Sequence, residues 1–266
     1  MSKDAQPGRF ADKVAMVTGA GSGMGAAVAR QLAAEGARAV VLADVNGEAA
    51  EVVAKDLPAG RALALDVADA AAVDGAVEDV LREHGRLDLL VHAAGVDDPE
   101  AKQWIADALA EGRPPEVTDR LADAAWRRVM RVNLDGTFHV LRAAVRAMRA
   151  AREGAIVVIG SSSAFDTPVG YPHYAASKAG VHAMSQAVAK EVIASGIRVN
   201  VVAPGPTETG MAARTPAALR TGLADARVRP YATPEEIADI ALFLASDAAA
   251  NLVGAVLLAN GGRFTA

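Results

Sequence analysis

The chain has 266 residues, of which 52 % are hydrophobic and 22 % are charged, and its formal net charge is −5. This length fits one large α/β domain or two small ones, and the mild acidity argues against a nucleic-acid or basic membrane-binding face. The absence of cysteine excludes disulfides and thiolate catalysis. No apolar run reaches transmembrane length and no signal-peptide pattern opens the chain, so a soluble cytoplasmic protein is expected.

Short aliphatic runs alternate with longer helical patterns along the chain. The predicted strands are, in order, 13–19, 38–44, 61–67, 87–95, 154–163, 197–205 and 254–262. The predicted helices are 23–37, 47–57, 69–85, 100–111, 119–151, 171–195 and 234–246. Because the strand runs are continuously apolar, the sheet should be buried on both faces. The alternation predicts one α/β domain over 1–266, a doubly wound Rossmann-type parallel sheet with helices on both faces.

The predicted helix at 119–151 is the longest. Its apolar residues recur at helical spacing, which predicts a stripe that packs on the sheet. The stripe consists of Trp126, Val129, Val132, Phe138, Leu141, Val145 and Met148.

A glycine-rich turn joins the first predicted strand to the first predicted helix. In the run VTGAGSGMGAA, Gly19, Gly23 and Gly25 permit a tight turn and close approach of a ligand to the backbone. The helix should begin at about Gly23, so its N-terminal N–H groups and dipole favour a pyrophosphate beside Ser22 and Met24. Such a turn alone is a weak signal, but its place at the first strand–helix junction predicts a dinucleotide site.

Acidic residues follow the second and third predicted strands at one edge of the sheet. Asp44 ends the second strand, where its carboxylate would accept hydrogen bonds from a ribose diol and repel a 2′-phosphate. No Arg or Lys lies at 20–24 or 45–47 to hold that phosphate, which favours NAD over NADP. Asp66 ends the third strand and could meet an adenine amino group, with Val67 against the ring. Each aspartate could also cap the helix that follows it.

Tyr174 and Lys178 lie four residues apart in the run YPHYAASKAG. A helix places such a pair on one face, about one turn apart. The alanine and serine residues around the pair leave room for a ligand. An isolated Y-x-x-x-K is more often a surface helix with unrelated side chains, so its meaning depends on the rest of the chain.

The motifs occur together in a characteristic order. They are T-G-x-x-x-G-x-G at Thr18–Gly25, Asp44, Asp66–Val67, Ala94–Gly95, Asn133, Ser161, Tyr174–Lys178 and Pro204–Gly205. With this order and spacing the chain resembles the short-chain dehydrogenase/reductase family over essentially its whole length. The resemblance implies a nicotinamide dinucleotide cofactor and an alcohol or carbonyl substrate. It also implies a homotetramer built on the helices at 119–151 and 171–195 and on the C-terminal strand.

The resemblance also assigns site residues. It implies a catalytic set of Ser161, Tyr174, Lys178 and Asn133. Ser161 stands 13 residues before Tyr174, which is the family's spacing, with Ser162 and Ser163 as the fallback. Further cofactor contacts are implied after the fourth strand, where Ala93 replaces an asparagine usual in the family, and in the run APGPTETG. These contacts are Ala93, Gly95, Pro204, Gly205, Thr207 and Thr209.

The implied chemistry is proton transfer coupled to hydride transfer. A free tyrosine has a pKa near 10, and a neighbouring ammonium and a positive nicotinamide both favour the phenolate. Lys178 is therefore expected to lower the pKa of Tyr174, which acts as general acid/base while Ser161 orients the same oxygen. By resemblance, the long helix is distorted at Asn133, which precedes the poor helix former Gly136, and holds a water that links Lys178 to solvent.

Two segments bear on the substrate. The segment at about 97–117 is longer than the family requires, and it covers either a substrate mouth or an interface, or has no function. The substrate loop at about 206–232 should line a pocket with Ser163, Phe165, Pro206 and Met211. Its arginines would suit a small or anionic substrate, although flexible solvent-facing side chains explain the same composition. They are Arg214, Arg220, Arg227 and Arg229.

Two alternative functions remain on the same fold. A halohydrin-dehalogenase-like lyase would resemble this family but carry arginine in place of the lysine. A non-catalytic dinucleotide-binding sensor would be expected to lose Tyr174 or Lys178. Both residues are present, which favours an NAD-dependent oxidoreductase acting on a secondary alcohol or ketone. No His, Asp or Glu spacing indicates a metal site.

Overall fold

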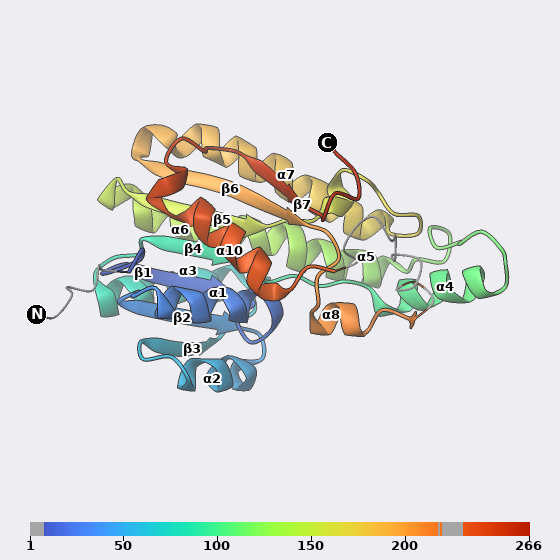
Figure 1. Ribbon diagram of the computed structural model, residues 1–266, viewed down its shortest axis with the longest axis horizontal. Helices are drawn as coiled ribbons and strands as arrows, with labels where there is room; N and C mark the ends of the chain where they lie inside the picture. Colours follow the sequence, from blue (N-terminus) through green and yellow to red (C-terminus); the bar gives the residue numbers. More distant parts are fainter. Residues whose placement is uncertain (1–7, 218, 220–230) are drawn as a thin grey trace, which may run out of the picture.

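A seven-stranded parallel sheet forms the centre of the part of the chain that the computed structural model describes, which comprises residues 8–217, 219 and 231–266 (Figure 1). The strands lie in the order β3-β2-β1-β4-β5-β6-β7. Their bounds are β1 Val14–Thr18, β2 Ala39–Asp44, β3 Gly60–Ala64, β4 Leu89–His92, β5 Gly154–Ile159, β6 Ile197–Pro204 and β7 Val256–Ala259. The chain moves outward from β1 to β3 and then returns to β4 on the other side of β1. This reversal opens a crevice at the carboxyl ends of β1 and β4.

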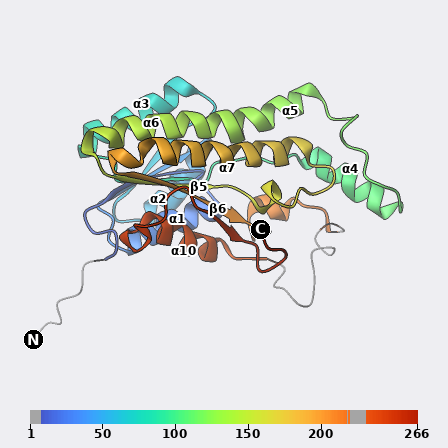
Figure 2. The same ribbon diagram turned by 90° about the horizontal axis from the view of Figure 1, so that it is seen from above.

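Helices cover both faces of the sheet (Figure 2). The helices α3, α6 and α7 lie on one face, and α1 and α10 pack together on the other, with α2 beside β3. The helices with bounds are α1 Gly23–Ala34, α2 Gly47–Lys55, α3 Ala70–His84, α4 Pro99–Ala110, α5 Asp123–Met130, α6 Gly136–Ala151, α7 Pro172–Val192, α8 Gly210–Ala213 and α10 Pro234–Ala245. The helix predicted at 100–111 is therefore present as α4.

The hydrophobic core is divided by the sheet into two parts. Leu32, Leu42 and Leu242 belong to the part beneath α1 and α10. Leu90 and Ile156 belong to the part beneath α3, α6 and α7. Alternate residues of each strand thus pack on opposite helix layers, which confirms the prediction of a sheet buried on both faces.

The long helix predicted at 119–151 differs from the expectation at its start and in its middle. It begins at Asp123, and a π-helical turn at Arg131–Asp135 separates α5 from α6. The predicted apolar stripe was wrong at two positions, because Trp126 and Phe138 are 40 % and 48 % exposed. Each lies three residues from a buried position, which is a rotation of about 60° around the helix and places the ring at the edge of the buried face.

The third strand is also shorter than predicted. It ends at Ala64, so Asp66 and Val67 lie beyond it and not at its last positions. The backbone N–H of Leu65 still donates to the carbonyl of Asp44 at 2.8 Å, which keeps the chain beside β2 for one more residue. Asp66 therefore leaves the sheet at the same edge as Asp44.

The C-terminal end of α10 is held by Arg198 on β6. Its Nη1 donates to the carbonyls of Leu244 at 2.7 Å and Ala249 at 3.2 Å. Its Nη2 donates to Ala245 at 3.2 Å and Ser246 at 3.0 Å. One guanidinium therefore satisfies carbonyls that the end of a helix leaves without partners.

We expect Arg198→Met to lower the free energy of unfolding by about 2–3 kcal/mol, because four carbonyls at the end of α10 lose a charged donor. Urea denaturation followed by circular dichroism measures the change. Arg38→Met is the matched control, since the exposed Arg38 reaches only one helix-terminal carbonyl, that of His84 at 2.8 Å. Equal losses in the two variants would contradict the capping role of Arg198.

Candidate active site

The turn between β1 and α1 is packed so closely that glycine is required. Gly19 has a φ of +68°, and a Cβ on Gly25 would lie 2.2 Å from the carbonyl oxygen of Gly19. The backbone N–H of Gly21 donates to Oδ2 of Asp44 at 2.9 Å. The glycine-rich turn and the end of β2 are therefore fixed to each other.

The N-terminus of α1 has no side-chain cap among the residues that the structure describes. Its N-cap residue, Ser22, makes no side-chain capping bond, and the first turn holds no acidic residue. In contrast, α2, α3, α4 and α10 are capped by the side chains of Asn46, Asp69, Asp98 and Thr233. The N–H groups of α1 thus remain open to an external anion.

Asp44 faces this turn and does not cap α2. Its Oδ1 accepts from the N–H of Asn46 at 2.9 Å, whereas Oδ1 of Asn46 accepts from Ala49 N and caps the helix. Asp66 likewise accepts from Ala68 N at 2.9 Å, and Asp69 is the cap of α3. The capping alternative is therefore wrong for both Asp44 and Asp66.

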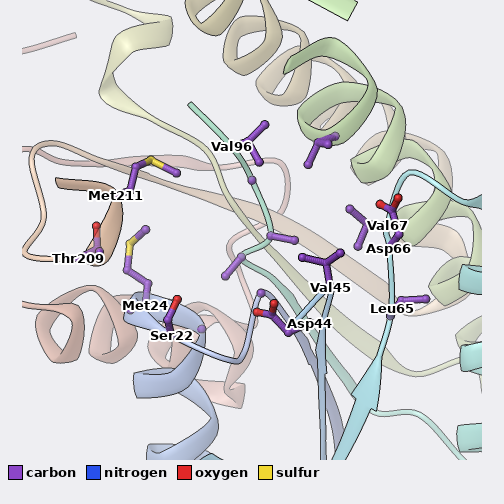
Figure 3. A pocket seen from close by; sticks show the side chains of 18 of the residues that line it. Ser22, Met24, Asp44, Val45, Leu65, Asp66, Val67, Val96, Thr209 and Met211 are labelled. Carbon is purple, nitrogen blue, oxygen red and sulfur yellow. The ribbon is translucent and has the colours of Figure 1, made fainter. Parts of the chain in front are cut away.

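A cavity of about 460 Å³ opens beside these groups at the carboxyl edge of the sheet (Figure 3). Met24, Thr209 and Met211 lie together on one side, and Asp44, Val45, Asp66 and Val67 lie on the other. The predicted cofactor residues that line it are Gly19, Ser22, Gly23, Met24, Gly25, Asp44, Asp66, Val67, Ala93, Gly95 and Thr209. Segments that are far apart in the sequence thus form one elongated site.

Three arginines also line the cavity, of which sequence reasoning named Arg214 in the substrate loop and missed the other two. The three are Arg128 on α5, Arg131 at the start of the π turn and Arg214 after α8. Nη2 of Arg131 lies 3.8 Å from Oδ2 of Asp66. No local pattern marks Arg128 and Arg131, because they reach the cavity only once α5 and the π turn have packed against α7.

Tyr174 and Lys178 face each other on α7. Nζ of Lys178 lies 6.0 Å from the centroid of the Tyr174 ring, as the one-turn spacing predicts. The ammonium is buried and donates to the carbonyl of Ile159, the last residue of β5, at 3.0 Å. Burial lowers the pKa of Lys178 to about 8, so its charge titrates close to neutral pH.

The pKa of Tyr174 differs from the sequence expectation. Burial raises it above its ordinary value, and hydrogen bonding with the side chain of Ser161 opposes that rise. In the chain without a cofactor, desolvation of the phenolate therefore outweighs the Ser161 hydrogen bond that favours it.

Ser161 is placed by contacts on both sides of its backbone. It follows β5, and its hydroxyl accepts from the N–H of Ser163 at 3.1 Å. Its own N–H donates to Nε2 of His182 at 3.3 Å, and a Cβ on Gly160 would overlap that ring. Close packing of His182 on the end of β5 therefore orients Ser161 toward Tyr174.

Asn133 lies at the centre of the π turn, which confirms the predicted distortion of the helix. Its Oδ1 accepts from Val96 N at 2.8 Å, and its Nδ2 donates to Val96 O at 3.0 Å and to Ser177 Oγ at 3.1 Å. A Cβ on Gly95 would lie 3.3 Å from Oδ1 of Asn133 and 3.6 Å from Nζ of Lys178. Glycine at position 95 thus leaves space between Asn133 and Lys178.

A buried hydrogen-bonded chain connects β1 to the π turn through His92. Nδ1 of His92 lies 2.7 Å from Thr18 Oγ1, and its Nε2 lies 3.0 Å from Thr137 Oγ1. The hydroxyl of Thr137 donates to the carbonyl of Asn133, so it accepts from His92 Nε2–H, and Thr18 donates to Nδ1. A neutral imidazole satisfies this arrangement, and burial lowers the pKa of His92 to about 3.

Comparisons with known proteins agree with this geometry. The family model described as short chain dehydrogenase matches residues 13–220. The chain is 42 % identical to cis-4-hydroxycyclohexanecarboxylate dehydrogenase of Sinomonas cyclohexanicum, over 95 % of this chain and 97 % of that protein. The chain belongs to the short-chain dehydrogenase/reductase family. It is therefore an oxidoreductase of alcohols or ketones that binds a nicotinamide dinucleotide.

Other relatives of this short-chain dehydrogenase have similar lengths. The 3-oxoacyl-(acyl-carrier-protein) reductase FabG of Escherichia coli is 36 % identical over 96 % of this chain and 98 % of its own. The solved structure of gox2181 superposes with a TM-score of 0.83 at 31 % identity, covering 96 % of each chain. The similarity thus extends over the whole Rossmann-type fold, which is shared with solved structures.

Some predicted residues of the dehydrogenase do not line the cavity. Thr207 is buried and its hydroxyl donates to Gly205 O at 3.1 Å, while Gly205 packs on Asn260. The predicted residues outside its lining are Asn133, Ser161, Ser163, Phe165, Tyr174, Lys178, Pro204, Gly205, Pro206 and Thr207. Arg220, Arg227 and Arg229 lie outside the described residues. The cavity approaches Lys178 at Gly95, which belongs to the cavity lining.

The described residues of the dehydrogenase contain no group of three or more His, Cys, Asp or Glu side chains that could hold a metal ion. In the same residues, no helix is both long enough and apolar enough to cross a bilayer.

We expect acid to destabilise the dehydrogenase through its buried histidines. Burial lowers the pKa of His92 to about 3 and that of His182 to about 4, so below pH 6.5 the unfolded chain binds protons that the folded chain does not. Each histidine should then remove about 1.4 kcal/mol of unfolding free energy per pH unit, until the pH reaches its folded pKa.

The contribution of His182 can be isolated with His182→Gln. Urea titrations between pH 7 and pH 4.5 should give a smaller fall in unfolding free energy for this variant than for the unchanged chain. The difference should equal the contribution of one histidine. Parallel profiles would contradict the assignment of a lowered pKa to His182.

Proposed function

We propose that the chain transfers a hydride between NAD and a secondary alcohol or ketone, with Tyr174 as the general acid/base. The observation that carries this proposal is the convergence of Tyr174, Lys178 and Ser161 at the carboxyl end of β5. Lys178 Nζ is 6.0 Å from the Tyr174 ring, and hydrogen bonding with the side chain of Ser161 lowers the pKa of Tyr174 against the effect of burial. This set matches the residues that the family resemblance implies.

The cavity fits an elongated dinucleotide. Its glycine turn and the uncapped N-terminus of α1 would hold the pyrophosphate, Asp44 would accept from the adenosine ribose diol, and Asp66 with Val67 would border the adenine. Ala93, Gly95 and Thr209 continue the wall toward Lys178, and Pro204, Gly205 and Thr207 are proposed as contacts near the nicotinamide. When bound, the nicotinamide accepts or supplies the hydride.

Proton transfer falls to the chain's own residues. Tyr174 takes a proton from the substrate hydroxyl or returns one to the carbonyl oxygen, and Ser161 donates to that same oxygen and stabilises its developing charge. Because burial raises the pKa of Tyr174 in the chain alone, the phenolate needs positive charge brought close to it. Lys178 supplies one such charge and would also bond the nicotinamide ribose.

Asn133 is proposed to hold the water through which Lys178 reaches solvent. Its Oδ1 and the ammonium of Lys178 border the same space beside Gly95, where both lie within 3.6 Å of the point that a Cβ would occupy. Its bonds to Val96 and Ser177 fix the amide in the π turn. Asn133 would therefore act on the proton path and not on the substrate.

A homotetramer is proposed for the assembly. Trp126 and Phe138 expose large apolar rings on α5 and α6, the helices on which the resemblance places an interface. Light scattering of the purified chain tests this, since a monomeric mass would contradict it.

The proposed reaction is tested by absorbance at 340 nm with NAD⁺ and a panel of secondary alcohols and hydroxy acids. We expect NADH to form with at least one alcohol. Binding of NAD⁺ in calorimetry without turnover on any alcohol would indicate a non-catalytic sensor. Halide release from a halohydrin without any dinucleotide would indicate a lyase.

A further inference from the structure

The segment 97–117 lies between two parts of the molecule that the proposed reaction needs. It contains α4, which projects from the carboxyl end of the sheet on the same side as α8 (Figure 1). One side of this segment contacts the chain before and within the start of α7, which carries Tyr174. Its other side contacts residues 211–215, which follow directly on Thr209 and Gly210 of the cavity wall.

The contact with α7 combines a buried hydrogen bond and apolar packing. Oδ2 of Asp98, the N-cap of α4, lies 3.1 Å from Nε2 of His173, whose side chain is fully buried. A Cβ on Gly170 would lie 2.8 Å from Ile105 and 3.1 Å from Val117. The segment therefore packs closely against Gly170 and His173, which precede Tyr174 in the chain.

The contact with residues 211–215 is centred on the ammonium group of Lys102. Nζ of Lys102 donates to Asp97, to Thr215 Oγ1 at 2.9 Å and to the carbonyl of Met211 at 3.3 Å. These three acceptors use all three donors of the ammonium. Lys102 and Asp97 are only 7 % and 4 % exposed, and Nη2 of Arg214 lies 3.5 Å from the second oxygen of Asp97.

A buried charge without hydrogen-bond partners costs free energy, so the partners of Lys102 and Asp97 are held in place by these two charges. Met211 and Arg214 line the cavity, yet α8 has only four residues and a Cβ on Gly210 would meet nothing within 4 Å. Thr209 caps the N-terminus of this short helix. Buried contacts from Lys102 reach Met211 and Thr215, and Asp97 contacts Arg214. The position of this wall of the cavity therefore depends on α4.

We propose that Lys102 is a positioning residue that fastens residues 211–215 to α4. The segment 97–117 would then set the width of the substrate mouth, by which we mean the part of the cavity that Met211 and Arg214 of the predicted substrate loop line. Lys102 touches neither the cavity nor the reacting groups and acts through Met211 and Arg214. The fastening stands on the contacts above, whereas its effect on substrate choice rests on the proposed dehydrogenase function.

Hydrogen exchange of the whole chain, without substrate, tests the fastening directly. Ala213, Arg214 and Thr215 have backbone N–H groups that bond within 209–215. Lys102→Met should speed exchange at these three amides by about tenfold or more, because local opening no longer breaks the buried contacts. Lys102→Arg should restore most of the protection, and Gln103→Met, on an exposed position of the same helix, should leave it unchanged.

Thr215→Val provides a second test if Lys102→Met does not fold. It removes only the hydroxyl that accepts from Lys102 and keeps the ion pair with Asp97. We expect a smaller increase in exchange at the same amides. Unchanged exchange in the folded variants would overturn the fastening.

Kinetics with a small and a bulky secondary alcohol test the effect on the mouth. Lys102→Met should change the ratio of the two KM values by at least about threefold while kcat for the small alcohol stays within about twofold. Loss of folded enzyme alone would lower kcat for both alcohols equally and leave the KM ratio unchanged, and that result would overturn the effect on width. Absence of turnover in the unchanged chain would instead refute the proposed function, with the exchange result still deciding the fastening.

Discussion

Tyr174→Phe should lower kcat by about 10²- to 10⁴-fold and leave NAD binding nearly unchanged. The substitution removes the hydroxyl that exchanges the proton but keeps the ring beside Lys178 Nζ, 6.0 Å from its centroid. Cofactor affinity should persist because the glycine turn, Asp44 and the N-terminus of α1 are untouched. Turnover at 340 nm and calorimetry with NAD⁺ separate the two effects.

Tyr171→Phe is the matched control for this result. Tyr171 is the N-cap residue of α7, is partly buried and packs with the apolar cluster of Ala101, Ile105 and Val117. It lies one turn before Tyr174 on the same helix, so a general effect of losing a buried phenol would appear in both variants. Near-normal turnover in Tyr174→Phe, or an equal loss in Tyr171→Phe, would remove Tyr174 from the mechanism.

Asp44→Asn should narrow the preference for NAD over NADP by about 10- to 100-fold, since hydrogen bonds to a charged group contribute about 1.5–3 kcal/mol. Asp44 accepts hydrogen bonds from the N–H groups of Gly21 and Asn46, each at 2.9 Å. The asparagine retains one oxygen, which can accept one of these two bonds. The variant therefore removes the charge while preserving part of the turn. The ratio of kcat/KM for the two dinucleotides measures the change.

Asp66→Asn is the control for the cofactor preference. Asp66 also lines the cavity, but it lies beyond β3 and 3.8 Å from Arg131. Its proposed partner is the adenine, so both dinucleotides should lose affinity equally. An unchanged preference in Asp44→Asn would contradict the ribose assignment, and a shift in Asp66→Asn alone would transfer the assignment to Asp66.

Much of the dinucleotide site follows from local pattern. Gly19 directly follows β1, Gly25 lies in the first turn of α1, and Asp44 ends β2. Parallel strands bring their carboxyl ends to one edge of the sheet. Tyr174 and Lys178 face each other because a helix turns once in about four residues. The distortion at Asn133 could be expected by family resemblance, since Asn and Gly136 are poor residues for a helix interior.

Other features depend on contacts between distant segments. The pKa of Tyr174 rises because the whole fold removes water from the phenol, and no spacing of residues reports how complete that removal is. Trp126 and Phe138 carry the correct periodicity but lie at the edge of the buried face. Arg131 meets Asp66, and Lys102 meets Thr215, only after the helices have packed.

The amino-acid order alone was sufficient for the parallel doubly wound sheet, the glycine turn and the Tyr174–Lys178 pair, because each depends on backbone periodicity and nearest neighbours. Tertiary packing decided which charges are buried, which arginines reach the cavity and what the segment 97–117 contacts. Desolvation and ion pairing bring together residues that are far apart in the sequence. Lys102 and Thr215, for example, are 113 residues apart, and a contact over such a separation produces no periodic pattern in the sequence.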